Sequence, residues 1–317
     1  MGDATLTDAA AGGELRFEPD DRGGVTVVRD GHPQSHVCLA DPQWLAFDYV
    51  AHLALAIDAA APVAAPGPLR VTHIGGAGMT LARWVQATRP GSPQIVLEPD
   101  AALTEAVRAE LPLPRGHRIR VRPVTGRDGV AALRDASADV VVLDAYAAGR
   151  VPADLVSVEF FEQVCRVLTP SGLLTANLAD EPGLRHTARV VAGILAAGMG
   201  EVALVASHEV LKGRRFGNVV VAARRAGAGT SDGATPTVTQ GRARSPRNGS
   251  VLGDDRRNGR GVTMGELLRR PVASASLPTG IRAGAEVRRW LGGAMPWTDA
   301  DAVPSPEPPP AGSWRVR

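Results

Sequence analysis

The 317-residue sequence predicts an α/β fold, in which a mostly parallel sheet carries helices on both faces and follows a small N-terminal β-domain. Between residues 69 and 225, short apolar segments typical of strands alternate with segments of helical periodicity. The first of these apolar segments are apolar on both faces, which favours strands buried within a parallel sheet. Residues 14–39 instead alternate apolar and polar side chains around an Asp30-Gly31 pair, a pattern typical of an antiparallel hairpin.

The elements can be assigned in order along the chain. After the hairpin, apolar residues at helical spacing predict a helix over 41–60, with Asp41 as its cap and Pro42 in its first turn. Strands of the main sheet are expected in 69–76, 94–100, 118–126, 138–146, 172–178, 201–207 and 217–224. Further helices are expected in 80–90, 101–111, 128–135, 156–168, 184–198, 263–270 and 285–293. The last two strands are expected to form an antiparallel hairpin at the edge of the sheet.

These elements divide the chain into five segments. Residues 1–13 are expected to be disordered, 14–60 to form the small β-domain with a linking helix, and 69–225 to form the main domain. Residues 226–261 contain almost no bulky apolar side chain, so they cannot bury enough surface to offset the entropy lost on ordering. They are therefore predicted to be a disordered linker, followed in 262–317 by short helices and a Pro-rich tail.

Composition argues against several classes of protein. The formal net charge is only +2, so the molecule has no strong field to attract a polyanion, and we expect no nucleic-acid partner. No run of about 18 apolar residues occurs, so no membrane span is expected. The two cysteines, Cys38 and Cys165, lie apart from any histidine cluster, which argues against a disulfide framework and a metal site. The acidic N-terminus lacks the apolar core of a signal peptide, so we expect a cytoplasmic protein.

A cluster of glycines follows the first strand of the main domain. Gly75, Gly76 and Gly78 come directly after an apolar segment, and a helix is expected to begin near Thr80. Such a turn allows the backbone to approach a ligand closely, and the N-terminus of the helix faces the same place. A strand–helix turn that binds no ligand remains the alternative.

Acidic residues follow each of the next three strands. Glu98 lies about twenty residues after the glycines, where a carboxylate can accept both hydrogen bonds of a ribose diol. Asp128, followed by Gly129, begins a helix; it can accept a hydrogen bond from an adenine amino group, or it serves only as a helix cap. Asp144 ends the fourth strand, at the edge of the sheet where open α/β folds bind their ligands.

The spacing of the glycines argues against a dinucleotide. A dinucleotide fingerprint needs a third glycine near Thr80 and Leu81, where it would let the backbone approach the pyrophosphate. A nucleoside without a pyrophosphate fits better. The sequence therefore favours S-adenosylmethionine or a relative as co-substrate, without a metal.

Several stretches resemble the spermidine synthase family, and most closely its actinobacterial spermidine synthase-like members. They are QSHVCLADPQWLAFDYV, HIGGAGMTLARWV, VLEPD, GRDGVAAL and VVLDAYAAGRVPADLVSVEFFEQVCRVLTPSGLL, and the DADAVPSPEPPP segment is similar too. The resemblance covers about residues 24–224. It implies a methyltransferase-like Rossmann domain behind a small β-domain, and transfer of an aminopropyl group from decarboxylated S-adenosylmethionine to a polyamine. A small-molecule amine is the implied partner, and a homodimer is one implied assembly.

The resemblance also implies roles for individual residues. The glycine turn would hold the nucleoside, with Glu98 on its ribose and the Asp128-Gly129 pair at its adenine. Gln34, in the β-domain, corresponds to the glutamine that closes over the ligand. Asp144 corresponds to the first aspartate of the D-S-x-D-P motif, which makes it the expected catalytic residue and, with Tyr146, the expected contact to the amine.

Two positions depart from the family pattern. Ala77 replaces an aspartate that engages the aminopropyl amine, and Ala147 replaces the second aspartate of D-S-x-D-P. An ammonium loses hydration when it binds, so the absence of two carboxylates weakens the case for a polyamine. Two alternatives therefore stay open: a methyltransferase that uses S-adenosylmethionine, and a non-catalytic nucleoside-binding member. The first is possible because Ala77, unlike an aspartate, would not repel the carboxylate of S-adenosylmethionine. Asp48 or Tyr49 would lie near the family's helical contacts to the polyamine.

Overall fold

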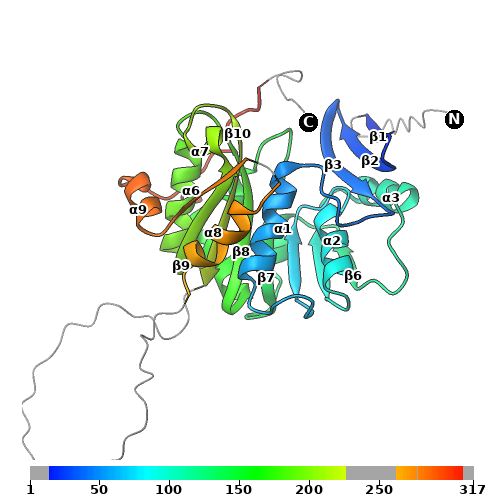
Figure 1. The fold of residues 1–317 in the computed structure, drawn as a ribbon, viewed down its shortest axis with the longest axis horizontal. Coiled ribbons are helices and arrows are strands. Elements are labelled where there is room, and N and C mark those ends of the chain that lie inside the picture. The colour runs from blue at the N-terminus through cyan, green and yellow to red at the C-terminus, as the bar shows by residue number, and fades with distance from the viewer. Residues whose placement is uncertain (1–13, 226–261, 277, 310–317) are drawn as a thin grey trace, which may run out of the picture.

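The computed structural model describes residues 14–225, 262–276 and 278–309 (Figure 1). This part of the chain contains a three-stranded sheet near the N-terminus and an eight-stranded sheet that forms the body of the molecule. The disorder predicted for 1–13 and 226–261, and the end of the Pro-rich tail, lie outside the described residues.

The main sheet is mostly parallel. Its strands are Val71–Ile74 (β4), Gln94–Leu97 (β5), Ile119–Arg122 (β6), Ala138–Leu143 (β7), Leu168–Asp180 (β8), Met199–Ser207 (β9), Gly217–Arg225 (β10) and Thr279–Ala283 (β11). They lie in the order β11-β9-β10-β8-β7-β4-β5-β6. β4 to β8 pair in parallel, whereas β10 runs antiparallel to β8 and β9, and β11 runs antiparallel to β9. The predicted fold class is therefore confirmed.

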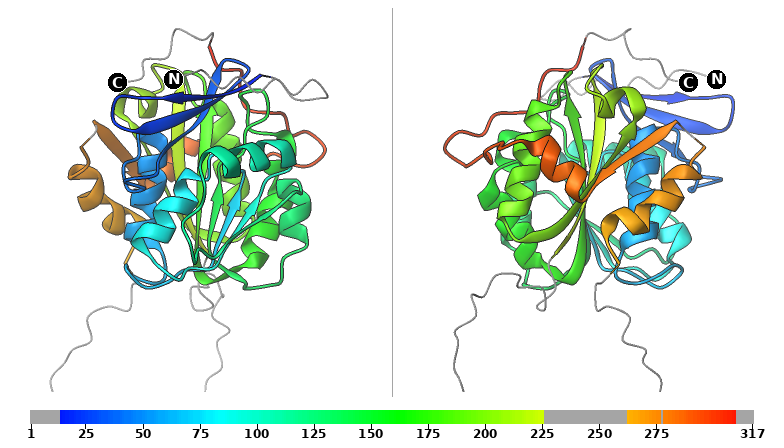
Figure 2. Two further views of the ribbon diagram at one scale, coloured as in Figure 1. Left: turned by 90° about the vertical axis from the view of Figure 1, so that its right-hand side faces the viewer. Right: turned by 60° about the vertical axis from the view of Figure 1, so that its left-hand side comes forward.

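Helices cover both faces of this sheet, and Figure 2 shows the two helical layers. Their bounds are Asp48–Ala60 (α1), Thr80–Thr88 (α2), Ala101–Glu110 (α3), Gly126–Ala131 (α4), Val158–Val167 (α5), Arg185–Ala196 (α6), His208–Leu211 (α7), Met264–Ala273 (α8) and Ala285–Leu291 (α9), with a short 3-10 helix at Ala153–Leu155. Apolar residues of α1, α2 and α8 pack on one face, and those of α4, α5 and α6 on the other. Val140 and Leu143 in β7 are fully buried, as expected for a central strand covered on both faces. Among the helices that the structure describes, none has the length and apolar character required to cross a bilayer.

The small sheet consists of Leu15–Pro19 (β1), Gly24–Arg29 (β2) and His32–Cys38 (β3), all antiparallel. Asp30 and Gly31 have φ values of +51° and +76°, so the predicted two-residue hairpin turn is confirmed. Val27 and Val37 of this sheet pack in one apolar cluster with Met79, next to the glycine turn. The hairpin therefore lies directly over the turn between β4 and α2 (Figure 1).

The helix predicted over 41–60 begins later than expected. Asp41 does not cap it; its Oδ1 accepts the N–H of Gln43 at 3.0 Å and its carbonyl accepts the N–H of Trp44 at 3.1 Å, which closes a turn. Phe47 is the N-cap residue of α1. Trp44 packs against His36 of β3, with 4.8 Å between ring centroids. Contact with the small sheet, rather than helical periodicity, therefore determines the backbone conformation of residues 41–47.

The antiparallel pairing of β9 and β10 is confirmed, but their predicted position at the edge of the sheet is wrong. β11 pairs with β9 and forms the edge instead. The five residues of β11, TGIRA, carry no clear strand signal, and the pairing joins positions far apart in the sequence. Local pattern therefore could not predict it.

The described part of the C-terminal segment lies on the main domain. Ser305 is fully buried, and its N–H donates to the carbonyl of Val151 at 3.1 Å. The N–H of Val151 in turn donates to Oγ of Ser305 at 2.9 Å. Nearer to α9, the carbonyl of Trp297 accepts the N–H of Val158 at 2.8 Å. Residues Trp297 and Ser305 thereby hold the segment between β7 and α5.

Candidate functional site

Glu98 fixes the glycine turn through its side chain. Its Oε2 accepts the N–H of Gly76 at 3.0 Å and that of Ala77 at 3.3 Å. Its Oε1 accepts the N–H of Asp100 at 3.1 Å. A carboxylate has about four lone-pair positions, so this group keeps the capacity to accept further hydrogen bonds from a diol. The structure thus brings together the glycines and the first predicted acidic residue.

The glycines are required by close packing between strand ends. A Cβ on Gly75 would lie 2.2 Å from the carbonyl oxygen of Asp144, and its φ of +85° also favours glycine. A Cβ on Gly76 would lie 2.5 Å from Cγ1 of Val96, in β5. The turn after β4 therefore lies directly between the ends of β5 and β7. Three of the predicted strand ends converge, and Asp144 belongs to the same site as the glycine turn.

The small sheet contacts the turn through a residue that sequence reasoning missed. Oγ of Ser35 accepts the N–H of Gly78 at 3.0 Å, and a Cβ on Gly78 would lie 2.8 Å from Cβ of Ser35. The hydroxyl of Thr80 donates to the carbonyl of His36 at 2.8 Å. Gln34 precedes Ser35, and its amide donates to a carbonyl of its own strand at 3.2 Å. A single serine in a hairpin strand has no spacing signal, so only the tertiary contact reveals its role.

Asp128 lies in the first turn of α4. Its N–H donates to Oγ1 of Thr125 at 3.1 Å, and that hydroxyl donates back to Oδ2 of Asp128 at 2.8 Å. Thr125 is the N-cap residue, so Asp128 takes part in capping. A Cβ on Gly129 would lie 2.6 Å from Cδ1 of Leu97, which places this helix start against the end of β5, beside Glu98. The Asp128 carboxylate is exposed. Its contact with the adenine therefore stays a prediction.

Two asparagines orient Asp144. Nδ2 of Asn177, in β8, donates to Oδ1 of Asp144 at 2.9 Å. Nδ2 of Asn218, in β10, donates to Oδ1 of Asn177 at 2.9 Å, which fixes the orientation of the Asn177 amide. Burial raises the pKa of Asp144 from 3.8 to about 6, although the Asn177 hydrogen bond lowers it. Sequence reasoning missed both asparagines, although Asn177 is a polar residue between the apolar Ala176 and Leu178.

Both tyrosines of the chain, Tyr49 and Tyr146, interact with Asp144. Burial, and then the neighbouring carboxylate, raise the pKa of each phenol well above its usual value. The hydroxyl of Tyr146 donates to the carbonyl of Asn177 at 3.3 Å. The phenols therefore remain neutral and polar beside a carboxylate that is ionised above a pH of about 6. Of the two residues suggested on α1, Tyr49 reaches this site, whereas Asp48 is exposed in the first turn beside His52.

Asn177→Ala is expected to raise the pKa of Asp144 further. The hydrogen bond to Asn177 stabilises the carboxylate, and a hydrogen bond to a charged group contributes about 1.5–3 kcal/mol, so its loss should raise the pKa by about 1–2 units. A carbon-detected NMR titration of the Asp144 carboxyl measures the shift. Asn218→Ala is the matched control, because it leaves the donor in place and should give a smaller shift. If the pKa of Asp144 is unchanged in Asn177→Ala, the hydrogen-bond relay from Asn218 through Asn177 to Asp144 does not stabilise the carboxylate.

The residues that the structure describes contain no group of three or more His, Cys, Asp and Glu side chains suited to a metal ion. His73, within β4, is buried, and its Nε2 lies 2.8 Å from Oε1 of Gln94. Cys38 and Cys165 are free. His73 therefore has a structural hydrogen-bond partner, and neither cysteine forms a disulfide.

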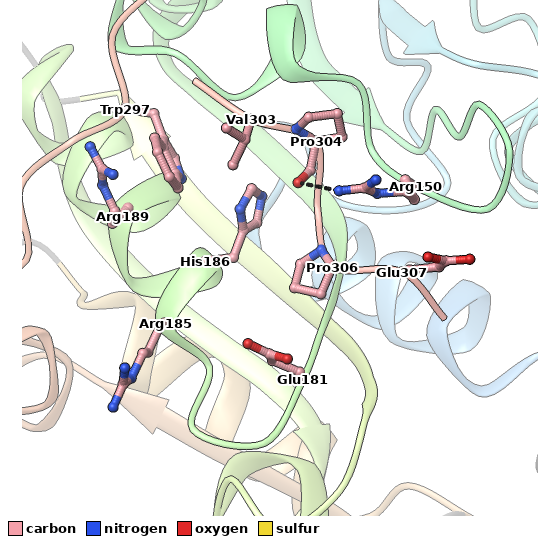
Figure 3. Close-up of a pocket in the computed structure, with 10 residues that line it drawn as sticks. All are labelled: Arg150, Glu181, Arg185, His186, Arg189, Trp297, Val303, Pro304, Pro306 and Glu307. Carbon is pink, nitrogen blue, oxygen red and sulfur yellow. Dashed lines mark hydrogen bonds between the residues drawn. The ribbon is translucent and has the colours of Figure 1, made fainter. Parts of the chain in front are cut away.

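A cavity of about 480 Å³ lies between the start of α6 and the C-terminal segment (Figure 3). His186 lies beneath the indole of Trp297, with 5.6 Å between ring centroids, and the guanidinium of Arg189 stacks 3.3 Å from the centroid of the indole. Nη2 of Arg150 donates to the carbonyl of Pro304 at 3.2 Å. The ten residues that line this cavity include none of the predicted site residues. Two of its arginines, Arg150 and Arg189, attach the C-terminal segment to the domain through backbone carbonyls.

Comparisons with known proteins identify the fold. No family model matches the sequence, and no curated protein matches it. A probable spermidine synthase from Corynebacterium glutamicum ATCC 13032 superposes with a TM-score of 0.74 and 26% sequence identity, over 94% of this chain and 97% of that one. The chain resembles the spermidine synthases. This bears out the resemblance read from the sequence.

More distant spermidine synthases share the fold. The enzyme from Thermotoga maritima matches with a TM-score of 0.52 and 16% identity, over 69% of this chain and 72% of that one. A spermidine synthase in complex with the transition state analogue AdoDATO matches with a TM-score of 0.51 and 16% identity, over 69% of this chain and 73% of that one. The chain thus shares the fold of these spermidine synthases.

Proposed function

We propose that the chain is a transferase of the spermidine synthase type, which binds S-adenosylmethionine or its decarboxylated form in the cytoplasm and transfers an aminopropyl group to an amine. The observation that carries this proposal is the contact between the glycine turn and Asp144. The backbone of Gly75 packs so closely against Asp144 that a Cβ on Gly75 would lie 2.2 Å from the Asp144 carbonyl oxygen. Asp144, the candidate base, therefore lies beside the turn that is expected to bind the nucleoside. Transfer requires such proximity of a co-substrate and a base.

The co-substrate would be held by groups around that turn. Glu98 supports the turn and would accept hydrogen bonds from the ribose hydroxyls. The first turn of α4, with Asp128 and Gly129, would contact the adenine. Gln34, in the strand that crosses the turn, would cover the nucleoside. A charged sulfonium would then lie near the Asp144 carboxylate, which stabilises a cation.

In the proposed reaction, a nitrogen lone pair of the acceptor attacks the aminopropyl carbon attached to the sulfonium. The new N–C bond forms as the C–S bond breaks, and the electron pair of that bond goes to sulfur, which leaves as the neutral thioether 5′-methylthioadenosine. The proton lost by the nitrogen passes to Asp144. Because the pKa of Asp144 is about 6, the carboxylate is ionised at neutral pH and is available as the base.

A methyltransferase is the second candidate, and Ala77 favours it. The N–H of Ala77 donates to Glu98 at 3.3 Å, so this residue lies at the turn where the nucleoside would bind. Its methyl side chain places no negative charge there. The carboxylate of ordinary S-adenosylmethionine would therefore meet no repulsion from this position.

Product analysis separates the two candidates. The protein is incubated with an amine mixture and each of the two co-substrates, and products are measured by mass spectrometry. Release of 5′-methylthioadenosine from the decarboxylated co-substrate supports aminopropyl transfer, whereas S-adenosylhomocysteine from the ordinary one supports methyl transfer. If calorimetry detects no binding of either nucleoside at millimolar concentration, both proposals fail.

Glu98→Gln is expected to weaken binding of the co-substrate about 10- to 100-fold. Glutamine keeps the size of the side chain but replaces one accepting oxygen with a donor, and a hydrogen bond to a charged group contributes about 1.5–3 kcal/mol. Calorimetry with both co-substrates measures the effect. Glu105→Gln, at an exposed position of α3, is the control with the same change of charge. Equal affinities for the two variants would argue against the ribose contact.

A further inference from the structure

We propose that Ser305 is a positioning residue, which fixes the loop that carries Asp144. This inference rests on the proposed function and deepens it, because Asp144 is the candidate base of the transfer. It follows from the contacts between two segments that are far apart in the sequence. One is residues 297–308, which we call the C-terminal strap, and the other is residues 144–151, the loop that follows β7.

Ser305 satisfies both backbone polar groups of Val151. The two residues are each fully buried. The N–H of Ser305 donates to the carbonyl of Val151 at 3.1 Å, and Oγ of Ser305 accepts the N–H of Val151 at 2.9 Å. A buried backbone group without a partner is unfavourable, so the position of Val151 depends on Ser305.

The strap also contacts the two residues before Val151. The guanidinium of Arg150 donates to the carbonyl of Pro304 at 3.2 Å (Figure 3) and to the carbonyl of Ser305. A Cβ on Gly149 would lie 3.0 Å from Cγ of Pro308. Three consecutive residues of the loop therefore lie against the strap.

The sequence of the strap suits a fixed position on the domain. Ser305 lies between Pro304 and Pro306, and Pro308 follows two residues later. Proline has a fixed φ and no N–H, so this segment is restricted to extended conformations, and Ser305 supplies the N–H at this point. A restricted segment loses less conformational entropy when it docks, which favours the bound position.

The other end of the loop leads directly to the candidate base. The N–H of Ala147 donates to the carbonyl of Arg150 at 2.8 Å, and the N–H of Arg150 donates back at 3.1 Å, which closes a tight turn. Tyr146 precedes this turn, and its hydroxyl donates to the carbonyl of Asn177 at 3.3 Å. The side chain of Asn177 in turn donates to Asp144. A displacement at the strap would therefore reach Tyr146 and Asp144 through a short, hydrogen-bonded piece of chain.

A second contact joins the strap to the predicted adenine side of the site. Nη1 of Arg127 donates to Oδ1 of Asp299, in the strap, at 2.8 Å. The same nitrogen donates to the carbonyl of Asp154, beyond the loop, at 3.0 Å. Arg127 is the neighbour of Asp128 in the first turn of α4. The strap thus links the start of α4 with the loop after β7, so we expect Asp128 and Asp144 to keep a fixed relative position.

Base catalysis is sensitive to such positioning. A base must lie within hydrogen-bond reach of the proton that it accepts, and a displacement of about 1 Å can lower the rate about 100-fold. The glycine turn is held instead by Glu98 and Ser35, through the N–H groups of Gly76 and Gly78. Loss of the Ser305 contact should therefore lower the rate more than it weakens binding of the co-substrate.

Ser305→Ala tests this role, with Ser92→Ala as the matched control. Ser92 is also fully buried, and its Oγ accepts the N–H of Leu69 at 2.9 Å, at the end of the sheet opposite the site. Each variant leaves a buried backbone N–H without its acceptor, so we expect both to lower the melting temperature.

The two variants should differ at the site. In Ser305→Ala, amide hydrogen exchange at Ala147 should become about 10-fold faster, and the carboxyl NMR signal of Asp144 should shift. The kcat for release of 5′-methylthioadenosine should fall about 10-fold, while the Kd of the co-substrate stays within about twofold of its value in the unaltered protein. Ser92→Ala should change none of these four quantities.

The exchange and NMR measurements do not depend on turnover. If Val151 exchanges faster but Ala147 does not, or if Ser92→Ala lowers kcat equally, the proposal is overturned. Arg150→Gln removes side-chain donors to the strap at a half-buried position, and it should change exchange and kcat in the same direction even if Ser305→Ala does not fold. If exchange at Ala147 responds as expected but the unaltered protein forms no product, the proposed transfer fails while the role of Ser305 in fixing the loop stands.

Discussion

Asp144→Asn should strongly reduce aminopropyl transfer and, at the same time, make the fold more stable above pH 6. Activity should fall about 100- to 10,000-fold, because a positioned general base contributes that much to a proton transfer. Asparagine keeps the shape of the side chain and can still accept from Asn177, whose Nδ2 lies 2.9 Å from Oδ1 of Asp144. It cannot accept the proton or neutralise an ammonium. Release of 5′-methylthioadenosine measures the loss.

The gain in stability follows from the pKa of the partly buried Asp144 carboxylate. Burial raises the pKa of Asp144 from 3.8 to about 6, so the folded state binds the proton more tightly than the unfolded state does. The stabilisation from the protonated group is complete below pH 3.8 and is lost as the pH rises through about 6. At pH 7–8 the ionised group therefore costs up to about 3 kcal/mol, which asparagine avoids.

Unfolding in urea at pH 4 and pH 8 measures this difference. The advantage of Asp144→Asn over the unaltered protein should appear at pH 8 and nearly vanish at pH 4. Asp154→Asn is the control, because Asp154 is exposed in the 3-10 helix that follows the same loop. A variant that loses stability at both pH values would show that Asp144 is a structural residue, and the catalytic assignment would be wrong.

Gly75→Ala should remove binding of the nucleoside by displacing the turn. A Cβ at this position would lie 2.2 Å from the Asp144 carbonyl oxygen and 2.8 Å from Cα of Ala145, and these are backbone atoms that cannot rotate away. The φ of +85° adds strain for any residue with a side chain. Together these effects should destabilise the protein by about 3 kcal/mol or more. Calorimetry and thermal unfolding measure the two consequences.

Gly91→Ala separates steric overlap from backbone strain. Gly91 has almost the same φ, +82°, but no atom lies within 4 Å of the position of its Cβ. It lies between α2 and β5, at the end of β5 opposite Glu98, so its substitution should cost about 1 kcal/mol and leave nucleoside binding intact. If both variants lose binding equally, the effect on binding comes from global destabilisation and not from the turn.

Local patterns in the sequence were sufficient for most elements. The alternation of strand-like and helical segments predicts β4 to β8, because strands covered on both faces are mostly apolar. The turn at Asp30 and Gly31 is predicted because two positive φ values need those residue types. The glycine turn and Glu98 could be predicted for the same reason: each depends on residue type and on spacing within one βαβ unit.

The tertiary structure decided what depends on distant partners. Residues 41–47 leave the helical pattern because Trp44 packs against the small sheet, and β11 joins the sheet only because β9 leaves an edge. The Asn218–Asn177 relay crosses three strands, and no spacing in the sequence relates its members to Asp144.

The physical distinction is the distance along the sequence between the residues that interact. Backbone conformation and burial are constrained by a residue's immediate neighbours, so the sequence by itself determined the fold class, the glycine turn and the strand ends that carry acidic residues. The pKa of Asp144, its two phenols and its two amides depend on groups that only folding brings together. Burial raises the pKa of the Asp144 carboxylate and the Asn177 hydrogen bond limits that rise, and both arise from packing between β7, β8, β10 and α1.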